Sequence, residues 1–76
     1  MTPHKGEVWQ HYKTKGEYEI LGPGKLQVKE PSLDMEDCVI YKALTDNTLW
    51  ARPLTDFTEL VLHEGGEMIP RFYKLR

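Results

Sequence analysis

The chain has 76 residues, of which 39% are apolar, 10 are basic and 12 are acidic, giving a net charge of −2. This length allows one domain, residues 1–76, and no apolar run approaches the roughly 20 residues that a membrane-spanning helix needs. The slightly acidic balance also argues against a dedicated nucleic-acid-binding protein, because such proteins are usually basic.

Cys38 is the only cysteine, so an internal disulfide is excluded. It lies in a β-branched and aromatic run, which is typical of a small buried side chain and not of a reactive thiol. A single thiol without a visible secretory leader favours a reducing compartment, so we expect a cytoplasmic protein. The histidines, His4, His11 and His63, lack the spacing of a zinc motif, so we expect no metal and no cofactor.

Aromatic side chains must then hold the domain together, because each of them buries about 150–250 Å² of surface. The sequence contains two Trp, four Tyr and two Phe. We expect the core to be built from these residues: Trp9, Tyr12, Tyr18, Tyr41, Trp50, Phe57, Phe72 and Tyr73.

The first part of the chain reads as a β-hairpin. Residues 7–12 are rich in β-forming side chains, although their alternation is imperfect. Residues 13–16 are polar and end in glycine, which predicts a turn. Residues 17–21 alternate cleanly and place Tyr18 and Ile20 inward.

The Gly-Pro-Gly sequence at residues 22–24 bends or breaks this second strand. Residues 26–28 alternate again, and they are expected to continue the strand beyond a β-bulge. Residues 29–37 look like the least ordered stretch, and their four acidic residues indicate a solvated loop.

Residues 38–44 form the strongest strand signal, with apolar side chains on both faces except Lys42. Such a strand is covered on both sides or lies centrally in a curved sheet. Residues 45–48 contain Asp-Asn, which suits a tight turn into a strand at 49–52. Pro53 lacks an N–H group, so this strand ends there or runs along an edge.

Residues 55–62 are the only helix candidate, with Thr55 or Asp56 as N-cap and room for one or two turns. The helical spacing is carried by an apolar stripe of Phe57, Leu60 and Val61. The glycine pair in residues 64–67 predicts a turn, and residues 68–73 return as an edge strand interrupted by Pro70.

About five short strands and at most one short helix predict a mainly β fold, a small, partly open barrel of the SH3-like or OB-like kind. An α+β roll, with the helix packed on a sheet, is the alternative.

Three segments carry a family resemblance: residues 6–13 with His-Tyr-Lys, residues 39–41 leading to Leu-Trp-Ala-Arg-Pro-Leu at 49–54, and Pro-Arg-Phe at 70–72. In these segments the sequence resembles a bacterial domain-of-unknown-function family numbered sixteen fifty-three. Only Ser32 survives from the His-Ser-Glu-Thr type stretch that the family often carries before the Val-Val-Tyr strand. The resemblance implies a small β-rich bacterial protein and brings no activity with it.

Arg52 and Arg71 are the first candidates for a site, because each lies beside a proline that restricts the local backbone. A guanidinium held in this way can bind a carboxylate or phosphate through two hydrogen bonds. We predict that the two arginines converge on one anion-binding face. The alternative is an internal ion pair with Glu7, Asp56 or Glu59.

His11 and Lys13 are the second candidates, because alternation places both on one side of their strand. A catalytic histidine also needs a nucleophile or an orienting acid, and the only serine, Ser32, is far away in sequence. Nucleic-acid binding is a weaker alternative that would use exposed aromatic and basic side chains. Its candidate residues are Trp9, Tyr12, Trp50 and Tyr73 with Lys13, Lys15, Lys25, Lys29, Lys74 and Arg76.

We therefore expect a non-catalytic binding or interaction module with an arginine-lined anion-binding face formed by Arg52, Arg71, His11 and Lys13. Its partner would be a protein or a small anionic ligand, and an edge strand at 68–73 would allow either a monomer or a homodimer. The alternatives are a small enzyme that uses His11 with an arginine anion pocket, and a weak nucleic-acid-binding barrel.

Overall fold

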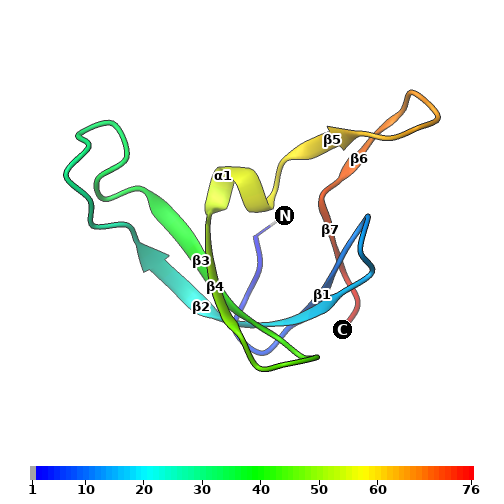
Figure 1. The fold of residues 1–76 in the computed structure, drawn as a ribbon, viewed down its shortest axis with the longest axis horizontal. Coiled ribbons are helices and arrows are strands. Elements are labelled where there is room, and N and C mark those ends of the chain that lie inside the picture. The colour runs from blue at the N-terminus through cyan, green and yellow to red at the C-terminus, as the bar shows by residue number, and fades with distance from the viewer. Residues whose placement is uncertain (1) are drawn as a thin grey trace.

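The computed structural model describes residues 2–76 and contains seven strands and one short helix (Figure 1). Five antiparallel strands form one sheet in the order β4-β3-β2-β1-β7, and β5 and β6 form a separate hairpin. The elements are β1 (Val8–His11), β2 (Glu17–Lys25), β3 (Asp37–Ala43), β4 (Leu49–Pro53), α1 (Leu54–Phe57), β5 (Leu60–Leu62), β6 (Met68–Pro70) and β7 (Phe72–Lys74).

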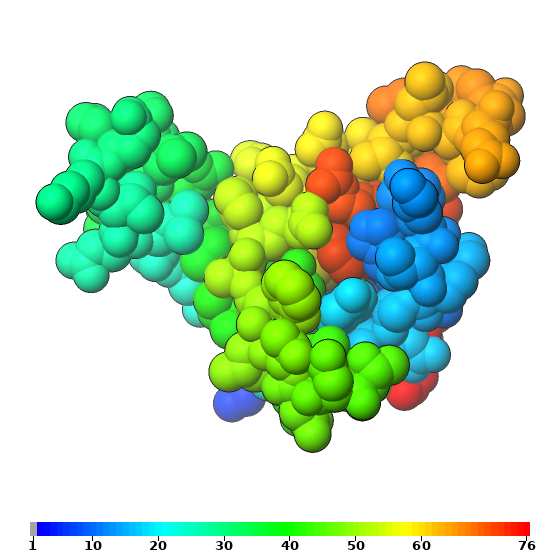
Figure 2. Space-filling model, viewed as in Figure 1, coloured from blue at the N-terminus to red at the C-terminus, as the bar shows by residue number. Residues whose placement is uncertain are grey.

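The predicted fold class is confirmed: the protein is mainly β, with one helix of four residues, and its five-stranded sheet does not close. Within residues 2–76, no helix is long enough to span a lipid bilayer. The sheet is strongly curved, and two arms project from it at the upper corners of Figures 1 and 2. One arm is the loop between β2 and β3, and the other is the β5–β6 hairpin.

The core lies on the inner side of the curved sheet and is mostly aromatic, as predicted. Phe57 from α1 is 1% exposed and stacks on Phe72 of β7, with the two ring centroids 4.1 Å apart. Trp9 and Tyr41 approach Phe57 edge-on at 5.5 and 5.4 Å. Aromatic pairs in these geometries add roughly 0.5–1.5 kcal/mol each beyond the burial of their area. The cluster comprises Trp9, Ile20, Val39, Tyr41, Phe57 and Phe72.

Three of the eight aromatic residues predicted for the core lie outside this cluster, and Tyr18 packs against it while partly buried. Trp50 is 52% exposed, Tyr73 is 40% exposed, and Tyr12 is half-buried. Trp50 is on β4, an edge strand that nothing flanks on its outer side within residues 2–76. The four buried rings fill the interior without it, so Trp50 is left on the open part of the inner face.

The predicted β-bulge lies in β2, where the register with β3 shifts between Ile20 and Gly22. The strand then continues through the Gly-Pro-Gly sequence to Lys25. The expected strand at residues 26–28 is wrong, because these residues belong to the loop before β3. Two backbone hydrogen bonds close that loop. The Met35 N–H donates to the Leu26 carbonyl at 2.7 Å, and the Leu26 N–H donates to the Glu36 carbonyl at 2.9 Å.

The predicted helix over residues 55–62 is mostly wrong. The helix is a single turn that begins after Pro53 and has no side-chain cap, and Leu60 and Val61 belong to β5 instead. The reason is tertiary pairing: Val61 lies opposite Ile69 of β6, and the strand ladder outweighs a weak local helical preference. The last predicted strand is split at Arg71, with β6 joining β5 and β7 joining β1.

Strand β3 is covered on both faces, as its composition predicts. Val39 and Tyr41 face the core and are each 3% exposed, while Cys38 on the other face is 4% exposed. Cys38 is a free thiol and acts as a small buried apolar side chain. The turn after β3 is also confirmed, because Asn47 has a φ of 62° and the Asp46 carboxylate accepts a hydrogen bond from Thr48 N–H at 3.0 Å.

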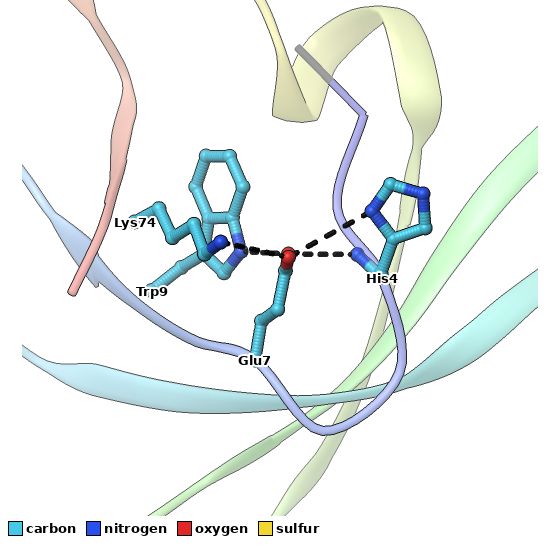
Figure 3. A network of polar contacts seen from close by, with 4 residues as sticks. All are labelled: His4, Glu7, Trp9 and Lys74. Carbon is cyan, nitrogen blue, oxygen red and sulfur yellow. Dashed lines mark hydrogen bonds and ion pairs between the residues drawn. The ribbon is translucent and has the colours of Figure 1, made fainter. Parts of the chain in front are cut away.

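The N-terminal segment is fastened to the sheet through the carboxylate of Glu7 (Figure 3). It accepts hydrogen bonds from His4 N–H at 2.8 Å and from the Trp9 indole N–H at 3.0 Å, and it pairs with the Lys74 ammonium at 3.2 Å. The backbone hydrogen bond from His4, followed by the Trp9 bond, lowers the pKa of Glu7 to about 2. The charged form of Glu7 therefore holds the buried indole in its orientation.

Candidate anion-binding pocket

A pocket of about 210 Å³ opens on the inner face of the sheet, beside the aromatic core. We call it the Arg52 pocket. In Figure 2 the segments of β4, β7 and β1 meet near the centre of the face drawn. The lining residues come from five strands and a turn that are distant in sequence: His11, Thr14, Tyr18, Tyr41, Trp50, Arg52 and Phe72.

The strand register explains why these side chains meet. Tyr41 lies opposite Trp50, and Val39 lies opposite Arg52 in the β3–β4 pair. Directly paired residues share one face of a sheet, and residues two apart on a strand do so as well. Trp50 and Arg52 therefore both project from β4 onto the face that carries the core.

Arg52 is positioned by two aromatic residues. Its Nε–H donates a hydrogen bond to the Tyr41 hydroxyl at 3.2 Å, and its guanidinium carbon lies 5.6 Å from the centroid of the Phe72 ring. Within residues 2–76, no carboxylate lies within 4 Å of this guanidinium. Because Nε is occupied by Tyr41, the two terminal amino groups are the end of the side chain that a planar anion can engage.

His11 forms the opposite wall of the pocket, with its ring against the edge of Phe72 at 5.1 Å. Its Nδ1 accepts hydrogen bonds from the backbone N–H groups of Lys13 at 3.1 Å and Thr14 at 3.4 Å. This arrangement requires an unprotonated Nδ1, so the neutral ring carries its proton on Nε2. Burial lowers the pKa of His11, and the nearby charges of Arg52, Arg71 and Lys13 lower it further. The ring is therefore a neutral hydrogen-bond donor at pH 7.

Arg71 lies in a different setting. Its guanidinium pairs with the Glu59 carboxylate at 3.3 Å, and its backbone N–H donates to the Glu59 carbonyl at 3.0 Å. The Arg71 carbonyl in turn accepts the Tyr12 N–H at 2.9 Å. Arg71 thus connects the β5–β6 hairpin to the main sheet, and one of the three acids named as alternatives, Glu59, neutralises its charge.

Charge is distributed unevenly around the pocket. No residue that lines it carries a carboxylate, whereas Arg52 lines it and Lys13 and Arg71 lie near its His11 wall. Of the acidic residues predicted to form a solvated surface, Glu30 and Asp34 are exposed in the loop before β3, Glu36 is half-buried there, and Asp37 is exposed at the start of β3. Within residues 2–76, no three His, Cys, Asp or Glu side chains are grouped as metal ligands.

Two larger hollows are less suited to an anion. One, of about 360 Å³, is mainly apolar, and Lys74 is its only charged lining residue within the described chain. The other, of about 370 Å³, brings Lys13 and Lys15 together with Glu64. Its histidine, His63, is held by Glu67 at 2.8 Å. The Arg52 pocket differs from the first hollow in the state of its cation: Lys74 pairs with the Glu7 carboxylate at 3.2 Å, whereas Arg52 has no carboxylate partner within residues 2–76.

Of the four residues predicted for the site, Arg52 and His11 line the same pocket, and Lys13 and Arg71 lie close to His11 outside the lining. Sequence reasoning missed Thr14, Tyr18, Tyr41, Trp50 and Phe72 as wall residues. Trp50 had a usable signal, because a strand at 49–52 puts it two positions from Arg52 on the same face. Ser32 hydrogen-bonds to Glu30 in the loop before β3 and is not part of the lining.

Comparison with known proteins gives one match. The model of the family described as Protein of unknown function (DUF1653) matches residues 7–74, so the chain belongs to this family. No curated protein and no solved structure matches the chain significantly. The family membership predicted from the sequence is confirmed, while the SH3-like or OB-like kind of barrel stays a prediction.

Proposed function

We propose that the protein is a non-catalytic binding module that holds a carboxylate or phosphate group of its ligand in the Arg52 pocket. The observation that carries this proposal is that the Arg52 guanidinium, positioned by Tyr41 and Phe72, has no carboxylate partner within residues 2–76 and lines a pocket without a carboxylate. The Nε2–H of His11 adds a neutral donor on the opposite wall. Charge-assisted hydrogen bonds of this kind are about twice as strong as neutral ones.

The composition of the pocket supports binding over catalysis. His11 has no carboxylate that would orient it as a general base, because its Nδ1 accepts backbone N–H groups. Among residues 2–76, no serine, threonine or cysteine side chain is hydrogen-bonded to the His11 ring. The Thr14 hydroxyl, which also lines the pocket, accepts a hydrogen bond from Gly16 N–H at 3.3 Å.

The size of the pocket supports a small ligand group. A volume of about 210 Å³ is below the range of roughly 300–1,000 Å³ for drug-sized ligands, so one side chain or one small acid fits. Single-stranded nucleic acid stays a weaker alternative, because the net charge is −2 and one exposed Trp offers little stacking surface. A cytoplasmic location fits the single buried thiol.

The test compares benzoate with benzamide, which has nearly the same shape without the charge. Trp50 is the exposed indole, so its fluorescence reports ligand entry, and calorimetry gives the dissociation constant. We expect benzoate to bind in the millimolar range, about −4 kcal/mol, and benzamide at least tenfold more weakly. Equal binding of the two compounds would contradict the proposal. So would the absence of benzoate binding at concentrations about 20-fold above the expected dissociation constant.

The matched variants are Arg52→Met and Lys29→Met, which each remove one positive charge. Lys29 is exposed in the loop before β3, so its loss tests the effect of net charge alone. Benzoate affinity should fall at least tenfold in Arg52→Met and stay within twofold in Lys29→Met. A similar loss in both variants would mean that the whole molecule attracts the anion and no built pocket exists.

A further inference from the structure

The outer edge of β4 is open, and its first three residues carry no charge or proline that would protect the edge against pairing. β4 is at one end of the five-stranded sheet, and its first three residues are exposed, including Leu49 at 63% and Trp50 at 52%. No charged side chain precedes Arg52 on this strand. The other edge strand, β7, has three residues, follows Arg71 and ends in Lys74. Natural proteins block open edges with short strands, charges and prolines, and on β4 the charge and the proline come only at its end, at Arg52 and Pro53.

The hydrogen-bond pattern identifies which groups of β4 are available. Ala43 N–H donates to the Thr48 carbonyl at 2.9 Å, so in this ladder Thr48, Trp50 and Arg52 direct their backbone groups toward β3. The N–H and C=O groups of Leu49 and Ala51 therefore face outward. Pro53, the next outward position, has no N–H group to leave unpaired.

We propose that β4 accepts an extended acidic peptide segment of another protein as an added strand, with a carboxylate of that segment seated on Arg52. Backbone hydrogen bonds to Leu49 and Ala51 would supply the pairing. Alternate side chains of the added strand would fall on the inner face, next to Trp50 and Arg52. This inference rests on the proposed function, because it assigns the anion in the Arg52 pocket to an Asp or Glu of the partner.

Charge complementarity argues against a second copy of this chain as the partner. Paired antiparallel with itself, β4 would contribute Leu49–Pro53 again, which contains an arginine and no acidic residue. Two Arg52 guanidinium groups would then be brought toward one interface without a counter-charge. A segment with an Asp or Glu opposite Arg52 provides that charge, and an apolar residue two positions away would cover Trp50.

The experiment selects binders to the full chain from a phage-displayed library of random ten-residue peptides. We expect the enriched sequences to carry Asp or Glu at one fixed position within a run of β-forming residues. Enrichment should be lost on Arg52→Met and kept on Lys29→Met. Enriched peptides without an acid, or no enrichment at all, would overturn the inference.

Two experiments test the strand addition: one changes the backbone of β4, and the other changes the backbone of the peptide. Ala51→Pro removes an outward N–H without touching a bond to β3, and we expect at least tenfold weaker binding of a selected peptide. As a control for effects of proline on folding, versions of the same peptide that are N-methylated at each position in turn are tested against the unmodified protein. Loss of affinity at alternate positions is expected, whereas a uniform or absent effect would rule out an added strand.

Two further outcomes separate the possible failures. If benzoate binds through Arg52 but no peptide is selected, the peptide inference fails and the proposed function stands. If neither binds, both fail. A dimer that sedimentation detects and that Ala51→Pro dissociates would show that β4 pairs with a second copy instead, and would overturn the inference.

Discussion

The regions around Arg52 and Arg71 share one sequence feature, a proline next to the arginine, but the two arginines have opposite roles. Each arginine lies beside a proline, at the end of β4 and at the junction of β6 and β7. Arg71 is neutralised by Glu59 and holds the hairpin to the sheet, while Arg52 faces aromatic rings and a pocket without an acid. A proline beside an arginine restricts the backbone and so positions the guanidinium. Whether that guanidinium forms an internal ion pair or stays available to a ligand depends on whether a neighbouring strand brings a carboxylate to it.

The largest effect is expected at Phe57, which supports both regions by stacking on Phe72. Phe57→Ala leaves a cavity beneath α1 and should cost about 3–5 kcal/mol, enough to unfold much of a domain this small. Phe57→Leu should cost less and keep the fold. Urea unfolding followed by circular dichroism measures both, and a cooperative Phe57→Ala variant of near-normal stability would break the aromatic-core account.

A smaller effect separates the two arginines directly. Arg71→Met loses the Glu59 pair and the fastening of the hairpin, so we expect about 1 kcal/mol of lost stability. Arg52→Met removes no ion pair and loses the hydrogen bond to the Tyr41 hydroxyl and the contact with Phe72, so we expect a smaller loss of about 0.5 kcal/mol. Urea midpoints of the two variants give the comparison. Equal losses would mean that Arg52 is as structural as Arg71.

The pH dependence of stability should reveal how much the charged Glu7 carboxylate stabilises the folded protein. Its pKa is about 2 in the folded protein against 4.5 in the unfolded chain, so the unfolded chain binds a proton first as the pH falls. The contribution of Glu7 is therefore complete above pH 4.5 and is lost as the pH approaches 2. Glu7→Gln should flatten this part of the curve; an unchanged slope between pH 4.5 and 2 would contradict the network of Figure 3.

The smallest effect concerns His11. Its folded pKa is lowered from 6.5, mainly by burial, so the unfolded chain again takes up the proton more readily. Stability should decline as the pH falls below about 6.5 and level off below the folded pKa. His11→Asn keeps an acceptor for the Lys13 and Thr14 N–H groups and should remove this slope. A stability that increases on acidification through this range would mean that His11 is charged in the folded protein.

Much of the fold follows from local patterns in the sequence. β-forming side chains predict β1, alternation predicts the first half of β2, and an apolar run predicts β3. The Asp-Asn pair predicts the turn into β4, and the Gly-Gly pair predicts the turn before β6. The helix over residues 55–62 fails because a weak local preference competes with strand pairing between Val61 and Ile69, which only the tertiary fold supplies.

Part of the site can be predicted from the sequence. Adjacent prolines single out Arg52 and Arg71, and alternation on a strand at 49–52 would have added Trp50 beside Arg52. The different roles of the arginines were not accessible, because Glu59 meets Arg71 only after β5 pairs with β6. Tyr41, which positions Arg52, is 11 residues away in sequence and is brought to it by the β3–β4 hairpin.

The central claim, that Arg52 is available to an anion while Arg71 is not, is tested most directly by a magnetic-resonance titration. The ¹⁵N-labelled protein is titrated with benzoate while the arginine Nε–H and histidine ring signals are followed in the same spectra. The account predicts that the Arg52 Nε–H and His11 signals shift and saturate together, while the Arg71 Nε–H signal stays in place. Shifts of Arg71 equal to those of Arg52, or no saturable shift at Arg52, would contradict it.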